Sequence, residues 1–324
     1  ARITAVGDLA AEHAGTVVDA TGRALAPGFI DVHSHDDFAV FFMPEMDFKV
    51  GQGVTTDVVG NCGFGAAPFG VARANLGVLG EPDRVDVLPR WDSYADYLDA
   101  IDAQPPSLNV AALVGHGTIR LDAMGNARRA PTPAELDRMT GTLTDALTAG
   151  CVGCSTGLIY EPGRYAATEE LVALAGAMAG VGGLYASHMR NEGDGLLDAV
   201  AETIQVGEAA GVPVQISHHK ATGPSAWGLV NDSLALIDAA RGRGVDVSAD
   251  QYPYTAGSTS LFAVLQNFEE GTAGVGATDW SKVVLASVPG HPEWEGESLA
   301  DRAAAAGTDA PQVARRIVDD VGYG

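Results

Sequence analysis

Short apolar runs with strand character alternate along this chain with longer runs rich in Ala and Leu, and this alternation predicts an α/β fold. Several of the longer runs begin after a Thr or Asn and end at a Gly, which is typical of helices. Seven strand-like runs follow one another in this way. Seven βα units in a row favour a (β/α)8 barrel of the TIM type over a doubly wound sheet.

The first strand is expected within residues 28–35, at the sequence GFIDVHSH. The other six strands are expected within residues 53–63, 109–117, 151–160, 183–189, 213–220 and 246–254. Helical patterns lie between them, most clearly at residues 132–150, 168–180, 195–211 and 230–244. The eighth strand of the barrel is expected to follow residue 324, so the chain predicts a barrel truncated before that strand.

Two further regions flank the barrel strands 1–7, which we place in residues 27–260. Residues 1–26 have the pattern of short strands and turns. Residues 261–324 contain two helical segments joined at a Pro, and we interpret this region as a helical insertion between strands 7 and 8. The chain starts without Met and stops abruptly after a helical pattern, so we expect the intact protein to continue at both ends.

The composition is that of a globular protein, with 46% hydrophobic and 19% charged residues among 324. The formal net charge of -23 makes nucleic acid a poor partner, because phosphate binding needs a basic surface. No apolar run reaches the roughly 18 to 20 residues that span a bilayer, so no membrane partner is expected. Three cysteines in a chain of this length form no disulfide framework, and we expect a reducing, cytoplasmic location.

Six of the eight histidines fall at predicted strand ends. Catalytic residues of a parallel barrel lie at the carboxyl ends of its strands, so these side chains are candidates for a site. Residues i and i+2 of a strand point to the same side, which lets His33 and His35 bind one ion. Cys62, His188 and His218 lie at later strand ends, and imidazole with thiolate ligands suits Zn²⁺.

The neighbouring candidates are interpreted less sharply. His218 and His219 are adjacent and point to opposite sides of a strand, so we assign His218 to the metal and His219 to helix packing or support of the ligands. His116 either lines the pocket or holds a loop. Cys151 and Cys154 are expected to be buried thiols, because i and i+3 point to opposite faces of a strand.

The charged residues near the strand ends leave further alternatives open. Arg190 and Glu192 either reach the substrate or form an ion pair within their loop. Asp250 is a fallback general base if no other aspartate is available. Lys220 is one of only three lysines in the chain and shares a face with His218, which favours a function over a surface position.

Seven motifs in order carry a family resemblance: APGFIDVHSHDD, QGVTTDVVGNCGFGAAP, GHGTIR, STGLIYEPG, YASHMRNEGD, VPVQISHHK and DQYPYTAGST. Together they resemble the N-acyl-D-amino-acid deacylases (D-aminoacylases) of the amidohydrolase superfamily, over nearly the whole chain. The resemblance implies a zinc-bearing TIM barrel beside a small β-sandwich built from both chain ends, with residues 1–26 as part of that sandwich. It also implies hydrolysis of the amide bond of a small-molecule N-acyl-D-amino acid.

Carried over by position, the resemblance implies roles for individual residues. The metal ligands of the family match His33, His35, Cys62, His188 and His218. Lys220 and Tyr252 match residues expected to hold the substrate. The catalytic aspartate of the family and a carboxylate-binding arginine are expected beyond residue 324, so this segment alone is expected to be inactive.

Two alternatives to the deacylase activity remain at this point. A cyclic-amide hydrolase of the hydantoinase or dihydroorotase type would carry a metal-bridging lysine on strand 4, where this chain has the sequence CSTGL. A non-catalytic metal-binding barrel would keep the ligands without the chemistry. The preferred D-amino acid, the number of metal ions and the oligomeric state are not readable from the sequence.

Overall fold

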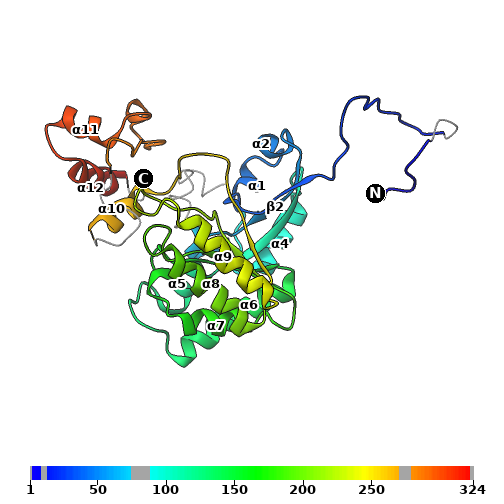
Figure 1. Ribbon diagram of the computed structural model, residues 1–324, viewed down its shortest axis with the longest axis horizontal. Helices are drawn as coiled ribbons and strands as arrows, with labels where there is room; N and C mark the ends of the chain where they lie inside the picture. The colour runs from blue at the N-terminus through cyan, green and yellow to red at the C-terminus, as the bar shows by residue number, and fades with distance from the viewer. Residues whose placement is uncertain (1, 9–12, 74–87, 270–278, 322–324) are drawn as a thin grey trace.

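The described residues form one parallel β-sheet with helices in the connections (Figure 1). The structure, a computed structural model, describes residues 2–8, 13–73, 88–269 and 279–321. Within these residues seven strands pair in parallel and in chain order. They are β1 (Phe29–Asp31), β2 (Val54–Val59), β3 (Asn109–Gly115), β4 (Gly153–Gly157), β5 (Leu184–His188), β6 (Val214–Ile216) and β7 (Val247–Ala249).

Every connection between consecutive strands contains at least one helix in the described residues, as βα units require. None of the described helices has both the length and the apolar character needed to cross a bilayer. The helices are α1 (Ala39–Phe42), α2 (Asp47–Val50), α3 (Phe69–Ala72), α4 (Tyr94–Ala103), α5 (His116–Met124), α6 (Pro133–Ala149), α7 (Thr168–Gly176), α8 (Leu196–Ala210) and α9 (Leu229–Gly242). After β7 follow α10 (Leu261–Glu269), α11 (Leu299–Ala306) and α12 (Ala310–Val321), with short 3₁₀ turns η3 (Gly163–Tyr165) and η4 (Pro292–Trp294).

The seven predicted barrel strands and the helices between them are confirmed, and the local sequence explains where helices begin and end. Thr132 caps α6 in a capping box with Glu135, and Pro133 occupies the first turn, where its missing N–H costs nothing. Gly150 ends the helix with a positive φ of 122°. These signals lie on either side of an amphipathic pattern that buries Met139 and Leu143 in the main hydrophobic core.

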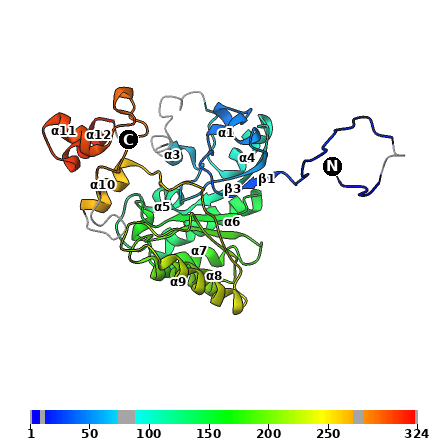
Figure 2. The same cartoon turned by 45° about the horizontal axis from the view of Figure 1, so that its top comes forward.

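The sheet is open, with β1 and β7 at its edges, and burial follows strand order. All residues of the interior strands β4 and β6 are buried, whereas Phe29 and Ile30 of the edge strand β1 are 60% exposed. The sheet nevertheless curls, as the contact between residues after its two edge strands shows: His33 Nδ1, after β1, lies 3.3 Å from Asp250 Oδ1, after β7. Helices α5 to α9 lie together around the body of the molecule in both views (Figures 1 and 2). The predicted fold class is therefore confirmed as a curled parallel sheet of seven strands with helices, of the α/β barrel type, while an eighth strand stays a prediction.

The region before β1 differs from the prediction of short strands. Residues 2–8 and 13–28 form neither helix nor strand, and they extend away from the body of the molecule (Figure 2). Apolar side chains such as Ile3, Val18 and Leu25 are at least 80% exposed. A strand needs a partner for its backbone groups, and the described residues supply none here. The assignment of residues 1–26 to a β-sandwich stays a prediction.

The region after β7 is helical, as expected, and has its own small core. Leu265 of α10, Leu299 of α11 and Ile317 of α12 are buried in one cluster. The break between α11 and α12 lies at Gly307, which has a φ of 65°, whereas the predicted joint Pro311 lies in the first turn of α12. Residues 270–278 and 322–324 of this region lie outside the described residues, and its position before an eighth strand stays a prediction.

We predict that Gly60→Ala destabilises the fold where β2 passes into the loop that follows it. Gly60 has a φ of 81°, and an added Cβ would lie 2.2 Å from the carbonyl oxygen of Leu113 in the neighbouring strand β3. Urea titration should show a free energy of unfolding lowered by about 2 to 4 kcal/mol.

Gly70→Ala is the matched control, since Gly70 lies in α3 and an added Cβ there meets nothing within 4 Å. It should leave stability unchanged or raise it by about 0.5 to 1 kcal/mol. Equal stability of the two variants would contradict the close packing of β2 on β3.

Candidate metal centre

The predicted metal ligands come from four different strands and meet on the side of the sheet where the carboxyl ends of the strands lie. His188 is the last residue of β5, and Cys62 and His218 follow the ends of β2 and β6. His33 and His35 lie in the loop after β1, which ends at Asp31. The alternation of side chains along a strand is therefore not what brings this histidine pair to the site. The turn after the strand does so.

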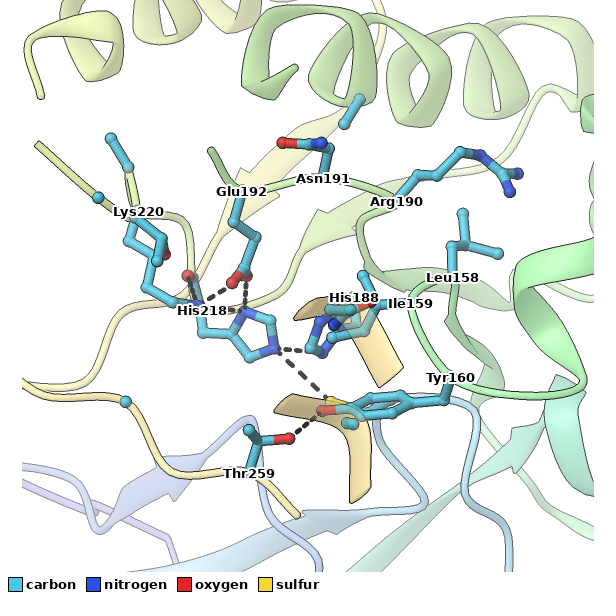
Figure 3. Close-up of a pocket in the computed structure, with 18 of the residues that line it drawn as sticks. Leu158, Ile159, Tyr160, His188, Arg190, Asn191, Glu192, His218, Lys220 and Thr259 are labelled. Atoms are coloured by element: carbon cyan, nitrogen blue, oxygen red, sulfur yellow. Dashed lines mark hydrogen bonds and ion pairs between the residues drawn. The ribbon is translucent and has the colours of Figure 1, made fainter. Parts of the chain in front are cut away.

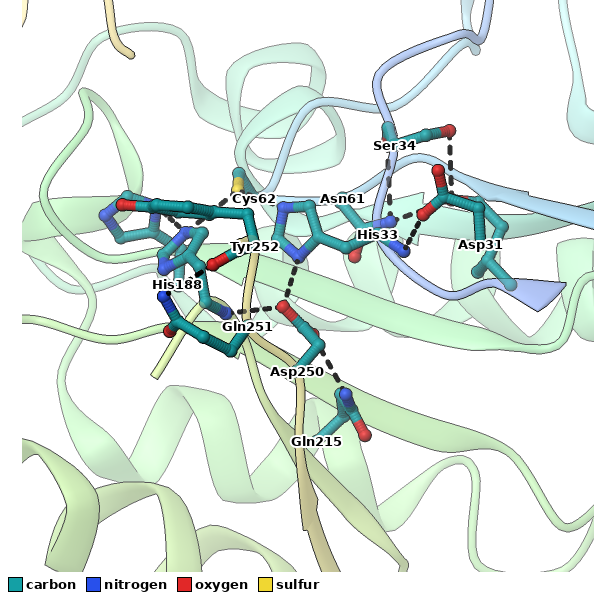
Figure 4. Close-up of polar contacts among 12 residues, drawn as sticks. Asp31, His33, Ser34, Asn61, Cys62, His188, Gln215, Asp250, Gln251 and Tyr252 are labelled. Atoms are coloured by element: carbon teal, nitrogen blue, oxygen red, sulfur yellow. Dashed lines mark hydrogen bonds and ion pairs between the residues drawn. The ribbon is translucent and has the colours of Figure 1, made fainter. Parts of the chain in front are cut away.

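The ring nitrogens and the thiol lie close together. Cys62 Sγ lies 3.3 Å from His33 Nε2 and 3.7 Å from His218 Nε2, and these three ligand atoms form one compact group. His218 Nε2 also lies 2.9 Å from His188 Nδ1. Figure 3 shows His188 and His218 facing each other, and Figure 4 shows Cys62 beside His33. The donors form two overlapping groups that share His218: His33, Cys62 and His218 in one, and His188, Glu192 and His218 in the other.

His35 lies beside this group, with its ring centroid 5.6 Å from that of His33. Burial, followed by the neighbouring His33 and His218, lowers the pKa of His35 to about 3. Burial likewise lowers the pKa of His188 well below its usual value. Both rings are therefore neutral near pH 7, which is the form that binds a metal.

The donor set fits a zinc ion. Within the described part of the chain, His35 Nδ1 and His188 Nε2 are buried without a hydrogen-bond partner, and buried polar atoms are rarely left so. Burial also raises the pKa of the Cys62 thiol, so a cation beside it would be needed to hold the thiolate form. Imidazoles with a thiolate are ligands that Zn²⁺ prefers.

Two of these residues have strained backbones. Cys62 and His218 have φ angles of 55° and 36°, in the left-handed region that non-glycine residues rarely adopt. Neighbouring groups hold both turns: the N–H of Gly63 donates to Ser155 Oγ at 3.0 Å, and the N–H of His218 donates to Asp250 Oδ1 at 2.6 Å. Such strain persists where the surroundings over-determine it, and it is common at functional sites.

A cavity of about 1130 Å³ opens beside the ligands, and Lys220 and Tyr252 line it together with His35, Cys62, His188 and His218. The Lys220 ammonium lies 5.5 Å from the centroid of the Tyr252 ring. It also donates to Glu192 Oε1 at 2.6 Å. The predicted substrate-binding pair and four of the five predicted ligands therefore share one cavity.

Glu192, which the sequence left undecided, belongs to this site. Its Oε1 lies 2.7 Å from His218 Nδ1 (Figure 3), whereas Cys62 lies near the other ring nitrogen, Nε2. Burial alone would raise the pKa of Glu192, but the hydrogen bond with His218 and the charges around it lower that pKa to about 2. A carboxylate on the far nitrogen of a ligating histidine fixes the orientation of the ring.

Arg190, the other undecided residue, is engaged elsewhere. It forms an ion pair with Glu202 at 3.0 Å and donates to the backbone carbonyl oxygens of Arg164 and Ala166. These contacts tie the loop after β5 to α8 and to the turn before α7. Arg190 therefore holds its loop.

The remaining candidates contact other parts of the protein and do not line the cavity. His116 is fully buried and contacts Glu170 at 2.8 Å, so it holds helices together rather than lining the cavity. His219 Nε2 lies 2.8 Å from Ser233 Oγ of α9, which confirms helix packing. Cys151 and Cys154 are buried free thiols, as predicted, and burial raises the pKa of each to about 12.

Tyr160 was not singled out in the sequence, although it lines the cavity. Its ring lies 4.9 Å from that of His188, and its hydroxyl lies 3.0 Å from Thr259 Oγ1. Tyr160 follows β4 by three residues. The same rule that selected the histidines, a polar side chain just after a strand, would have found it.

The chain matches the family model described as Amidohydrolase family over residues 16–319. It is 44% identical over 319 residues to an N-acyl-D-glutamate deacylase of Alcaligenes xylosoxydans xylosoxydans, covering 98% of this chain and 62% of that protein. It is also 44% identical over 265 residues to a D-aminoacylase of the same organism, covering 80% of this chain and 53% of the relative. The chain thus spans less than two thirds of the length of these relatives.

A solved structure is similar as well. The N-acyl-D-glutamate deacylase from Bordetella bronchiseptica, complexed with zinc and a phosphonate inhibitor, matches with a TM-score of 0.86 at 43% identity. The match covers 98% of this chain and 64% of that chain. The resemblance seen in the motifs is thereby confirmed: the chain belongs to the amidohydrolase family, and within it resembles the N-acyl-D-amino-acid deacylases.

Proposed function

We propose that this chain carries the metal-binding and substrate-binding residues of a zinc-dependent hydrolase that cleaves the amide bond of N-acyl-D-amino acids. One observation carries the proposal: a compact group of imidazole and thiol donors opens on a cavity that also holds a lysine ammonium. The deacylases to which the chain is 44% identical act on substrates of this class by name. Metal donors and a cation side by side suit a substrate with both an acyl carbonyl and a carboxylate.

The proposed zinc ligands are His33, His35, Cys62, His188 and His218. Zinc, when bound, supplies a Lewis acid that polarises a carbonyl and acidifies a water molecule. The protein contributes by holding the ligands in place before the metal arrives. Cys62 and His218 are set by their strained turns, and Glu192 orients the His218 ring from its far side.

Lys220 is proposed to bind the carboxylate of the amino acid, with Tyr252 beside it. The Lys220 side chain is 24% exposed and faces the cavity, and Glu192 holds its ammonium at 2.6 Å. A cation held at one distance from the metal ligands fixes where the α-carbon of the substrate lies. Two anchored groups alone do not distinguish the two hands of the substrate, so the hand then depends on where the cavity admits the side chain on the α-carbon.

Proton transfer is not assigned to Asp250. Its oxygens already accept from the N–H of His218 and from Gln215, and one of them contacts His33. A general base needs a free oxygen directed at the water that it deprotonates. We retain the proposal that the acid–base aspartate of the whole protein lies beyond residue 324.

The alternatives are less well supported. For a cyclic-amide hydrolase the resemblance implied a lysine on strand 4, and β4 (Gly153–Gly157) holds Ser155 and Thr156, both buried and hydrogen-bonded. For a non-catalytic barrel, the cavity and Lys220 beside the donors would have no purpose. A cytoplasmic location stays a prediction.

We predict that the protein binds zinc and that Cys62→Ala and His218→Ala abolish tight binding. Each change removes a donor from the compact group, and a zinc site loses most of its affinity for the metal when one of its ligands is removed. Metal analysis after gel filtration, together with competition against a chromophoric chelator, measures the loss.

Cys151→Ala is the matched control, because Cys151 is also a buried free thiol. Burial is the cause of its raised pKa, and Cys151 belongs to neither group of candidate metal donors among the described residues. It should retain the zinc content of the wild type. If Cys62→Ala and His218→Ala retained zinc as well, the proposed ligand set would be wrong.

We predict that Lys220→Ala weakens binding of N-acetyl-D-methionine by about 10- to 100-fold, since a charge-assisted hydrogen bond contributes about 1.5 to 3 kcal/mol. Calorimetry with the zinc-loaded protein measures this change. The amide analogue N-acetyl-D-methioninamide, which lacks the carboxylate, should bind the wild type and Lys220→Ala about equally.

Lys282→Ala serves as the control variant, because the Lys282 side chain is 80% exposed. It should bind both ligands as the wild type does. An equal loss of affinity for the acid and the amide in Lys220→Ala would exclude Lys220 as the carboxylate-binding residue.

A further inference from the structure

Asp250 follows β7 directly and is the point at which several of the proposed ligands are tied together. We infer that Asp250 is a positioning residue that orients His33 and His218 for metal binding. The inference rests on the proposed function, because it assumes that these histidines bind zinc. It assigns to Asp250 a role different from that of the general base considered from the sequence.

The first contact is with the ring of His33. Asp250 Oδ1 lies 3.3 Å from His33 Nδ1, while His33 Nε2 lies 3.3 Å from Cys62 Sγ (Figure 4). The carboxylate and the thiol therefore face opposite nitrogens of one imidazole. A carboxylate at Nδ1 favours the tautomer with its proton there, which leaves the Nε2 lone pair for a metal.

The second contact is with the backbone of His218. Asp250 Oδ1 accepts the N–H of His218 at 2.6 Å, and His218 has a left-handed φ of 36°. The backbone of Asp250 supports the same turn, because its carbonyl accepts the N–H of His219 at 2.9 Å and its N–H donates to Ile216 at 3.1 Å. These bonds on both sides of the turn oppose relaxation of the strained residue.

Asp250 is itself held in place. Its Oδ2 accepts from Gln215 Nε2 at 2.9 Å, and Gln215 Oε1 accepts from Ser248 Oγ at 2.6 Å. Figure 4 shows Asp250 between Gln215 and His33. The carboxylate therefore cannot turn away from His33 without breaking a hydrogen bond in a buried setting. A chain of contacts runs from β6 and β7 to the ligand loop after β1.

The same contacts could serve the sheet alone, since they join its two edges. The two roles differ in what they predict. A positioning role requires that zinc affinity and ligand geometry change when Asp250 is altered. A purely structural role requires that the stability of the metal-free protein changes while the affinity of the folded protein for zinc does not.

The test uses Asp250→Ala and Asp250→Asn in the whole chain, with zinc affinity measured by chelator competition and ligand geometry by the absorption spectrum of the cobalt(II) form. We expect Asp250→Ala to weaken zinc binding by about 10- to 100-fold and to shift the cobalt bands. Asp250→Asn should restore part of the affinity, because its carbonyl oxygen can still accept the N–H of His218. Thermal unfolding of the metal-free forms reports stability separately.

Asp246 provides the matched control, since it is exposed and precedes β7 at the opposite end of the same strand. Asp246→Ala should bind zinc as the wild type does. Gln215→Leu removes the donor that holds Asp250 without altering the carboxylate, and should weaken zinc binding by about 3- to 10-fold. It keeps the inference testable if Asp250→Ala fails to fold.

The outcomes separate the two proposals. If the wild type binds zinc, and Asp250→Ala and Gln215→Leu bind it within twofold with unchanged cobalt spectra, the inference about Asp250 is wrong and the metal centre stands. If the wild type binds no zinc, the metal centre is wrong and the inference falls with it. Weakened binding with shifted cobalt bands, against an unchanged Asp246→Ala, supports the positioning role.

Discussion

The parallel direction of the strands is the constraint on which the site depends. Because every described strand of the sheet runs in the same direction, all carboxyl ends lie on the same side of the sheet. Residues that are distant in sequence therefore meet there. Cys62 and His218, 156 positions apart, come within 3.7 Å of each other at their ligand atoms. An antiparallel pairing at any step would carry one of these side chains to the far edge.

Strand direction alone does not position the donor atoms of the proposed ligands. The turns after the strands direct these side chains toward one another. Cys62 and His218 adopt left-handed backbones, and buried hydroxyl and carboxylate groups from other strands hold those turns. Ser155 of β4 supports the first turn and Asp250 after β7 supports the second. The proposed ligands are thus preorganised by residues that are not themselves among the proposed ligands.

One buried carboxylate, that of Glu192, contacts two functional candidates in the cavity. Glu192 contacts both His218 and Lys220 through the same oxygen, so one buried carboxylate serves a proposed ligand and the proposed carboxylate-binding cation. Arg190, two residues earlier, also lines the cavity but pairs with Glu202 and not with a proposed ligand. Two neighbouring charged residues in one loop therefore have separate tasks, which depend on the direction in which each side chain leaves the turn.

The sequence by itself determined the order of strands and helices, because hydrophobic periodicity and capping residues act locally. It also selected the residues that gather at the site, since polar side chains after buried strands stand out from their apolar surroundings. Tertiary structure alone decided that Glu192 contacts His218 while Arg190 pairs with Glu202, and that Asp250 contacts His33 and is not a free base. Those outcomes depend on backbone turns and on contacts between β1 and β7, and no local pattern encodes such contacts between distant segments.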